Sequence, residues 1–414
     1  MIKLIMSFIL ILAISGWGMA TRVEAVSEIE FWTINLQPTF NDYFNRMIEQ
    51  YESENTGVKI VWKDLPFAAI QQKLLSSMAG GVSPDVVNLS TEMTRPLIEK
   101  KALVAIDQIN PNFADTYFAG IWQAGEYHGH VYAFPWYVST KVIMYNQEIF
   151  AAAGLDPEKP PKTMDDIKEF SRQIKDKTGI NGFIPHIRMY NEFVSHGIPL
   201  FSDEEQREVA FNTKEAVAVV QWYLDLINEE IITIEDIRGG YNEAIQRYMS
   251  GNLGMLITGP QFLSRIKTNA PAIYENTRVA HHPLGKAKVI NAAAMNVVIP
   301  KTSKNPQEAA DFAYFITGDY AQLEFSKIVN ILPSAIKATQ DDFFTAGDNT
   351  PEGIARRISA EQLQWARDMT ITAKNSSKLI KAIDEEFEKA YYGKITAEEA
   401  VANMAGRWEE ILSK

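Results

Sequence analysis

The sequence predicts an α/β protein of two lobes, each a mostly parallel sheet flanked by helices, with a hinge between them. The chain has 414 residues, and at roughly 150 residues per domain this length suits two or three lobes. Strand and helix patterns alternate from its first third onward, which is typical of a parallel sheet covered on both faces. An aromatic segment at residues 129–146 separates two such series.

The first series consists of three strands with helices between them. Alternating or continuous apolar residues predict strands at 28–32, 58–62 and 85–89. Apolar residues three and four apart predict a helix through 40–51, ended by Asn55-Thr56-Gly57, and another through 70–78.

The aromatic segment looks like a crossing from one lobe to the other. Its extended runs are 132–134 and 142–145. Because Pro135 cannot donate to a sheet ladder, we expect the first strand to stop there. Trp136 and Tyr137 would then be exposed, and flat aromatic faces beside hydroxyls suit the stacking of a sugar ring.

The same apolar spacing and capping signals predict the elements of the second series and of the C-terminal tail. Residues 163–166 resemble a capped helix start, and 216–227 form an amphipathic helix. Further strands are expected at 254–257 and 297–300, with a helix over 305–316. The tail reads as helices at 352–369, 376–391 and 396–412, the last opened by a capping box from Thr396 to Glu399.

Residues 1–25 are predicted to be a signal peptide. Lys3 precedes an apolar run over 4–14, and Val23-Glu24-Ala25 suits a signal peptidase, with cleavage after Ala20 as the alternative. A membrane anchor is the weaker interpretation, since a span needs about 18 apolar residues. The chain has no cysteine to carry a lipid, so we expect a periplasmic protein.

Composition excludes several functions. The net charge of −12 argues against nucleic acid and, more mildly, against anionic membrane surfaces. With no cysteine, disulfides, thiol nucleophiles and thiolate metal sites are impossible. No serine-hydrolase elbow, phosphate loop, dinucleotide motif or zincin motif is present, and the six histidines lack metal-ligand spacing. We therefore expect no catalytic residue, metal or cofactor, although a carboxylate pair for glycoside hydrolysis stays open.

Ligands of open α/β sheets lie beyond the carboxyl ends of the strands. That rule selects a set uncharged apart from Glu92, suited to a neutral polyhydroxy ligand: Thr33, Asn35, Gln37, Ser90, Thr91, Glu92, Trp136, Tyr137, Ser139, Gly259 and Gln261, with Tyr190 and Phe193 from an aromatic segment. Structural roles are the alternatives: hinge packing for Trp136 and Tyr137, and helix capping for Ser90 and Thr91.

Six segments in a shared order carry a family resemblance: EIEFWT, KLLSSMAGGVSPDVVNL, GHVYAFPWYVSTKVIMYNQEIFAAAGLDPEKPPKTMDDI, YMSGNLGMLITGP, IPKTSKNPQEAADFAYFITG and the tail GKITAEEAVANMAGRWEEIL. The chain resembles the extracellular solute-binding proteins of ABC importers, in the carbohydrate branch that contains maltose-binding protein. The resemblance implies a type II-like periplasmic-binding-protein fold, a sugar in the cleft between the lobes, and delivery to a membrane permease. It places the lobes at 26–137 plus 293–340 and at 138–292 plus 341–414.

The sequence departs from the family pattern in three places. Gln261 stands where a tryptophan is common, Ala293-Ala294-Met295 replace two glycines and an aromatic residue, and Ser90 replaces an acidic one. Met295 and Asn296 complete the candidate set. With fewer stacking faces, we expect a monomer that binds a sugar, small glycoside or polyol, chiefly through Trp136 and Tyr137. An exported carbohydrate-active enzyme, or the same fold with a non-sugar solute, is the alternative.

Overall fold

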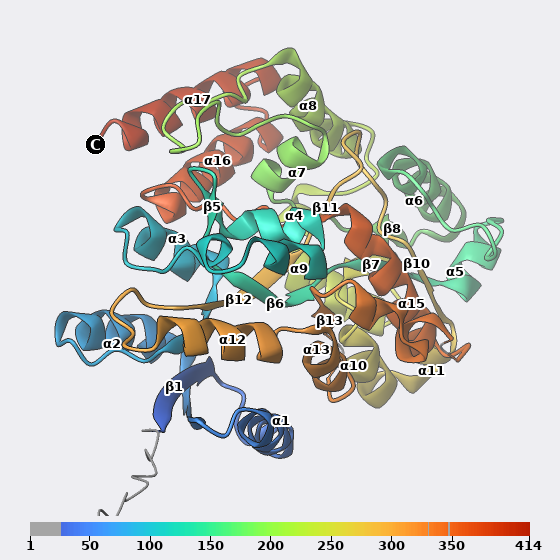
Figure 1. Ribbon diagram of the computed structural model, residues 1–414. Helices are drawn as coiled ribbons and strands as arrows, with labels where there is room; N and C mark the ends of the chain where they lie inside the picture. Colours follow the sequence, from blue (N-terminus) through green and yellow to red (C-terminus); the bar gives the residue numbers. More distant parts are fainter. Residues whose placement is uncertain (1–25, 330, 347) are drawn as a thin grey trace, which may run out of the picture.

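The structure is a computed structural model that describes residues 26–329, 331–346 and 348–414. The predicted signal peptide lies outside these residues. The chain folds into two sheet-centred lobes (Figure 1). The strands are β1 Ser27–Ile34, β2 Val58–Leu65, β3 Val86–Ser90, β4 Glu126–Tyr127, β5 His130–Val131, β6 Phe134–Ser139, β7 Val142–Asn146, β8 Asn181–Phe183, β9 Leu253–Thr258, β10 Thr277–Ala280, β11 Ile290–Asn291, β12 Ala293–Val298, β13 Leu332–Pro333 and β14 Ala366–Arg367.

Helices cover the sheets and form a further layer at the C-terminal end (Figure 1). They are α1 Asn41–Glu54, α2 Phe67–Ala79, α3 Thr91–Glu99, α4 Ala119–Trp122, α5 Gln147–Ala152, α6 Met164–Thr178, α7 Met189–Ser195, α8 Lys214–Asn228, α9 Ile234–Met249, α10 Phe262–Asn269, α11 Pro271–Glu275, α12 Pro306–Ile316, α13 Asp319–Ser326, α14 Asp342–Thr345, α15 Pro351–Gln362, α16 Ser376–Tyr391 and α17 Ala397–Leu412. Short 3-10 turns lie at Ile106–Gln108, Pro111–Thr116, Gln123–Gly125, Lys337–Gln340 and Leu363–Trp365.

Both sheets are mixed, so the expectation of mostly parallel sheets is wrong, although the α/β class is confirmed. The N-terminal lobe has the order β13-β6-β12-β3-β1-β2, in which only β1 pairs in parallel with its two neighbours. The C-terminal lobe has the order β10-β7-β9-β8, with only β8 and β9 parallel. The reason is the hinge: β12 and β7 enter their sheets at the edge where β3 and β9 end, so each runs against that neighbour.

Strand β6 continues through Pro135, which corrects the expected stop at this residue. A register irregularity in β12 lies opposite this part of β6, and β13 pairs only with Tyr137 and Val138. The missing N–H of Pro135 therefore costs no regular ladder bond. Since β6 ends at Ser139, Val138 and Ser139 belong to the six-stranded sheet; the lobe boundaries otherwise remain a proposal.

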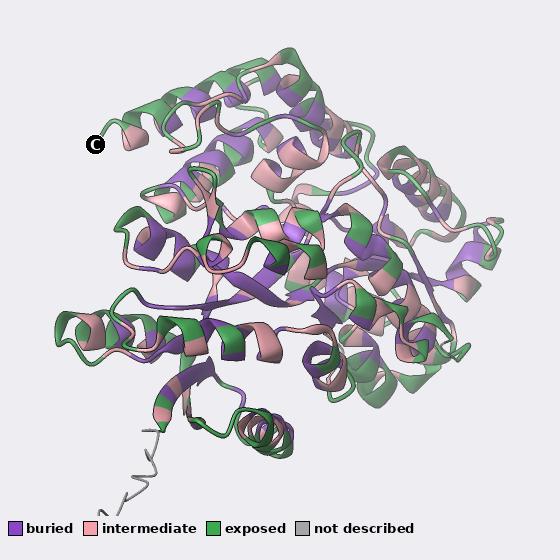
Figure 2. Cartoon of the chain, viewed as in Figure 1, coloured by how far each residue is buried: buried purple, intermediate pink, exposed green. Residues whose placement is uncertain are grey.

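Each lobe has its own hydrophobic core. Sheet residues and the inner faces of the helices are buried, and the outer helix faces are exposed (Figure 2). The N-terminal core packs β1 against α1 and α12, and the C-terminal lobe adds to its sheet core a helical core from α7, α8, α16 and α17. Within the described residues, no helix is both long enough and apolar enough to cross a membrane.

Candidate functional site

The hinge-facing edge of the six-stranded sheet gathers several predicted residues. In the ladder, Met295 of β12 lies opposite Ser90 of β3, and Ala293 lies opposite Ser139 of β6. The strand order places β3, β12 and β6 side by side, so residues about 200 positions apart in the sequence share one edge. Ser139 is exposed there, whereas Met295 is half-buried and Asn296 is buried.

The loop after β1 is held by a carboxylate that the sequence analysis did not select. Asp64 accepts hydrogen bonds from the Thr33 hydroxyl (2.6 Å) and from the backbone N–H groups of Leu36 and Gln37 (3.0 Å each). Thr33 is fully buried and also accepts from the Trp62 indole at 2.8 Å. Thr33 therefore supports the loop instead of facing a ligand, while Gln37 and Asn35 are exposed.

After β3, the capping interpretation holds for Ser90, whose hydroxyl accepts from the Met93 N–H at 3.3 Å. Thr91 is buried and donates to Asp368 at 2.6 Å. The Asn296 amide in turn donates to the Thr91 hydroxyl at 3.0 Å. These polar groups satisfy one another, so Glu92 is the residue of this turn that is left exposed.

Trp136 is fully buried, so the expectation of an exposed stacking face is wrong. Its ring lies among Phe31, Phe44 and Phe325, with centroids 5.2–6.2 Å away. Tyr137 is half-buried, and its ring lies 5.2 Å from those of Trp136 and Phe325. Burial raises its pKa, with Asp64 adding to the rise. Tyr137 remains the aromatic candidate of this segment.

The C-terminal lobe contributes Tyr190 and the turn after β9. Tyr190 is half-buried, and Glu92 and Asp368 lie close enough to raise its pKa further after the main effect of burial. A Cβ on Gly259 would lie 2.2 Å from the Gln261 side-chain oxygen, so Gln261, which is exposed, folds over a glycine that leaves it room. Phe193 is fully buried in the helical core and leaves the candidate set.

Sequence reasoning missed the residues through which the lobes touch. Arg95 donates to the Glu204 carbonyl at 2.9 Å, and His128 lies 3.5 Å from Glu204 and 3.6 Å from Glu205. A groove of about 420 Å³ runs beside this contact, between Arg95 and the segments 197–206 and 367–371. Nothing in local spacing indicated these residues, because they come together only when the lobes meet.

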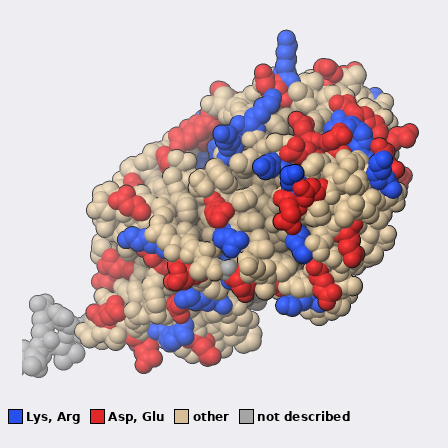
Figure 3. All heavy atoms as spheres, turned by 90° about the vertical axis from the view of Figure 1, so that its right-hand side faces the viewer, with Lys and Arg blue, Asp and Glu red and all other residues tan. Residues whose placement is uncertain are grey.

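The described residues contain no group of three histidines or carboxylates able to hold a metal ion. On the face drawn in Figure 3, basic and acidic side chains alternate without a continuous basic patch. The candidate residues that stay exposed or half-buried carry amide, hydroxyl and aromatic groups, and Glu92 is the charged one among them.

Gln362 ties the hinge segments together. Its amide donates to the Lys141 carbonyl at 3.1 Å, between β6 and β7, and accepts from the His282 N–H at 2.6 Å, after β10. We expect Gln362→Leu to lower the free energy of unfolding by about 1–3 kcal/mol, because two backbone groups lose their partner. Urea unfolding measures it, with the exposed neighbour Gln364→Leu as the control. Equal midpoints for the two variants would contradict the role.

Comparison with known proteins agrees with this architecture. The sn-glycerol-3-phosphate-binding periplasmic protein UgpB of Pectobacterium atrosepticum is 22% identical, over 96% of this chain and 94% of that one. A periplasmic-binding protein from Synechococcus sp. MITs9220 is 28% identical with a TM-score of 0.81, over 93% of this chain and 99% of that one. The cyclic alpha-maltosyl-1,6-maltose binding protein from Arthrobacter globiformis shares the fold at 20% identity and a TM-score of 0.77, over 93% and 98%.

A family model is matched as well, and it covers more than half of the chain. The match is to bacterial extracellular solute-binding proteins and spans residues 37–323, which include both sheets apart from strands β1 and β13. This chain belongs to the family of bacterial extracellular solute-binding proteins.

Proposed function

We propose that the protein captures a sugar, small glycoside or polyol between its lobes in the periplasm and delivers it, chemically unchanged, to the permease of an ABC importer. The observation that carries the proposal is that both lobes leave uncharged polar and aromatic side chains exposed or half-exposed at the predicted positions. Gln37, Tyr137 and Ser139 come from one lobe, and Tyr190 and Gln261 from the other. The names of the relatives, which refer to sugars and to a polyol phosphate, support this ligand class.

Hinge closure supplies the mechanism. A ligand that touches both lobes makes its full set of contacts only when they meet, so binding shifts the population toward the closed form. The contacts of Arg95 and His128 with the loop around Glu204 link the lobes directly. We infer that the permease recognises this closed arrangement and that the carrier acts as a monomer.

A ligand panel tests the proposal. Thermal-shift and calorimetric measurements would compare mono- and disaccharides, small glycosides, polyols and sn-glycerol 3-phosphate, since a ligand selective for the native state raises the melting temperature. We expect a neutral polyhydroxy compound to bind and to be recovered intact. A converted product would establish the alternative of a carbohydrate-active enzyme, and binding confined to amino acids or polyamines would overturn the ligand class.

Tyr137→Ala is expected to weaken binding of the best ligand from that panel about 3- to 10-fold, the loss of one aromatic–sugar contact. Calorimetry measures the dissociation constant, and Tyr392→Ala, at an exposed tyrosine of the tail, is the matched control. Unchanged affinity in Tyr137→Ala would remove this residue from the site.

A further inference from the structure

A polar chamber lies inside the C-terminal lobe, behind the hinge. Its volume is about 90 Å³, several times what a single water requires. The side chains that give it its chemistry are Lys141, His186, Asn191, Glu192 and His282. Strand β9 contributes Leu256 and Ile257 to the wall, and α7 faces them from the other side.

Lys141 supplies a positive charge that lacks a partner. It stands directly before β7, where the chain enters the lobe. Among the described residues, none makes a side-chain hydrogen bond or ion pair with its ammonium group. Burial lowers the pKa of Lys141, and nearby Glu192 offsets part of that effect. Removing an ammonium group from water costs free energy, and a hydrogen-bond acceptor or an anion beside the group is needed to offset that cost.

The wall formed by α7 supplies the complementary groups. Glu192 lies on it, near Lys141 but farther than a direct ion pair, and burial raises the pKa of its carboxyl, against a hydrogen bond from Tyr223. The side-chain oxygen of Asn191 and Nδ1 of His186 are both inaccessible and without a hydrogen-bond partner in the described residues. Buried polar atoms of this kind are normally satisfied, by protein or by a bound molecule.

Three histidines line the chamber: His186, His196 and His282. Nδ1 of His196 lies 2.8 Å from the Glu192 carbonyl oxygen. The other two add no charge near neutral pH. Burial lowers the pKa of His186 and of His282 to about 4 in each case, so both rings are neutral. Arg188 lies outside the lining and is 3.6 Å from Asp384. The chamber thus presents one ammonium and one carboxyl group that do not meet. A simple anion would face Glu192, and a simple cation would face Lys141.

We propose that this chamber binds a small zwitterion of the α-amino acid type, with its carboxylate toward Lys141 and its ammonium toward Glu192 and Asn191. Each of these half-buried charged groups then gains an opposite charge, which a neutral polyol cannot provide. The site is separate from the sugar site proposed above: its wall includes none of Gln37, Tyr137 or Gln261.

A surface hollow adjoins the chamber. The hollow, of about 400 Å³, shares Met164, Glu192, His196, Tyr223 and Gly285 with it. The hollow opens beside the partly or fully exposed residues Asp165, Glu215 and Lys286, so both signs of charge line its mouth. Glu192 therefore lines both the chamber and the surface hollow.

The test uses probes of similar size that differ in charge: L-alanine, propionate, ethylamine and propane-1,2-diol. Equilibrium dialysis with labelled L-alanine and thermal shift with all four are measured on the mature protein at pH 7. We expect L-alanine to bind at one site per chain and to raise the melting temperature by about 1 °C or more at saturation. The other three probes should bind at least tenfold more weakly.

Two variants locate the site. Lys141→Met and Glu192→Gln should each weaken L-alanine binding at least tenfold, whereas Lys301→Met and Glu49→Gln, at exposed positions of the other lobe, should leave it unchanged. If a chamber variant fails to fold, the comparison of the four probes on the wild-type protein still decides. Propane-1,2-diol or propionate binding as well as L-alanine, or no probe binding at all, would overturn the proposal.

Discussion

Trp136→Ala is expected to lower the free energy of unfolding by about 3–5 kcal/mol, the usual range for truncating a buried aromatic side chain. The tryptophan is fully buried between strand β1 and helices α1 and α13, whose rings Phe31, Phe44 and Phe325 surround it. Alanine would leave a cavity that this rigid aromatic cluster cannot fill.

Urea unfolding followed by circular dichroism measures the effect, and Trp365→Ala, at a partly exposed tryptophan, is the control expected to cost less. The result also separates two roles for the segment. A Trp136→Ala protein as stable as the wild type that binds sugar poorly would restore Trp136 to the binding site and contradict its place in the core.

Local signals predicted most elements well because their causes are local. The capping boxes at Thr163 and Thr396 are both present, with Asp166 and Glu399 as the reciprocal partners. The apolar stripe from Phe40 to Tyr51 is the buried face of α1. Such hydrogen bonds and contacts lie within four residues in the sequence, so a single sequence contains them.

Long-range pairing is what the sequence did not reveal. The predicted helix over 352–369 ends at Gln362, because Ala366 and Arg367 pair with β11 and Asp368 turns to Thr91 and to the Ala294 N–H. These partners lie more than 70 positions away, and no local pattern predicts them. The same holds for Trp136, whose burial depends on α1 and α13 closing over β6. Ser139, Gln261 and Glu92 are exposed, as a ligand contact requires.

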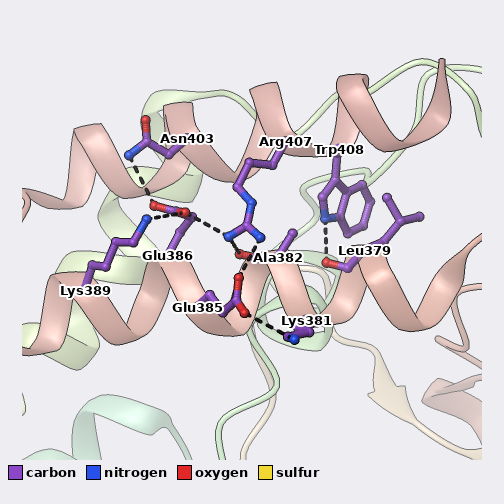
Figure 4. A network of polar contacts seen from close by, with 9 residues as sticks. All are labelled: Leu379, Lys381, Ala382, Glu385, Glu386, Lys389, Asn403, Arg407 and Trp408. Carbon is purple, nitrogen blue, oxygen red and sulfur yellow. Dashed lines mark hydrogen bonds and ion pairs between the residues drawn. The ribbon is translucent and has the colours of Figure 1, made fainter. Parts of the chain in front are cut away.

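The second large effect concerns Glu386, the buried centre of an ion network between α16 and α17 (Figure 4). Its side chain is only 2% exposed and accepts hydrogen bonds from Lys389 at 2.7 Å, Arg407 at 2.9 Å and Asn403 at 3.2 Å. Arg407 also reaches Glu385 at 2.6 Å. Beside the network, the buried Trp408 indole donates to the Leu379 carbonyl at 2.8 Å. The two last helices are thus joined by charge as well as by packing.

We expect Glu386→Gln to lower the free energy of unfolding by about 1.5–3 kcal/mol at pH 7, because three donors lose a charged acceptor.

Burial alone would raise the pKa of Glu386, but the hydrogen bonds from Lys389 and Arg407 prevail and hold it below the ordinary value of 4.5. A carboxyl group whose pKa is lower in the folded than in the unfolded protein stabilises the fold at pH values above its unfolded-state pKa. This stabilisation is lost as the pH falls through the folded-state pKa. The gap between wild type and Glu386→Gln should therefore be full at pH 7 and vanish in acid. Urea midpoints from pH 7 to pH 3 measure it, with the exposed Glu388→Gln as control; a gap that does not narrow as the pH falls would show that packing, and not charge, underlies the loss.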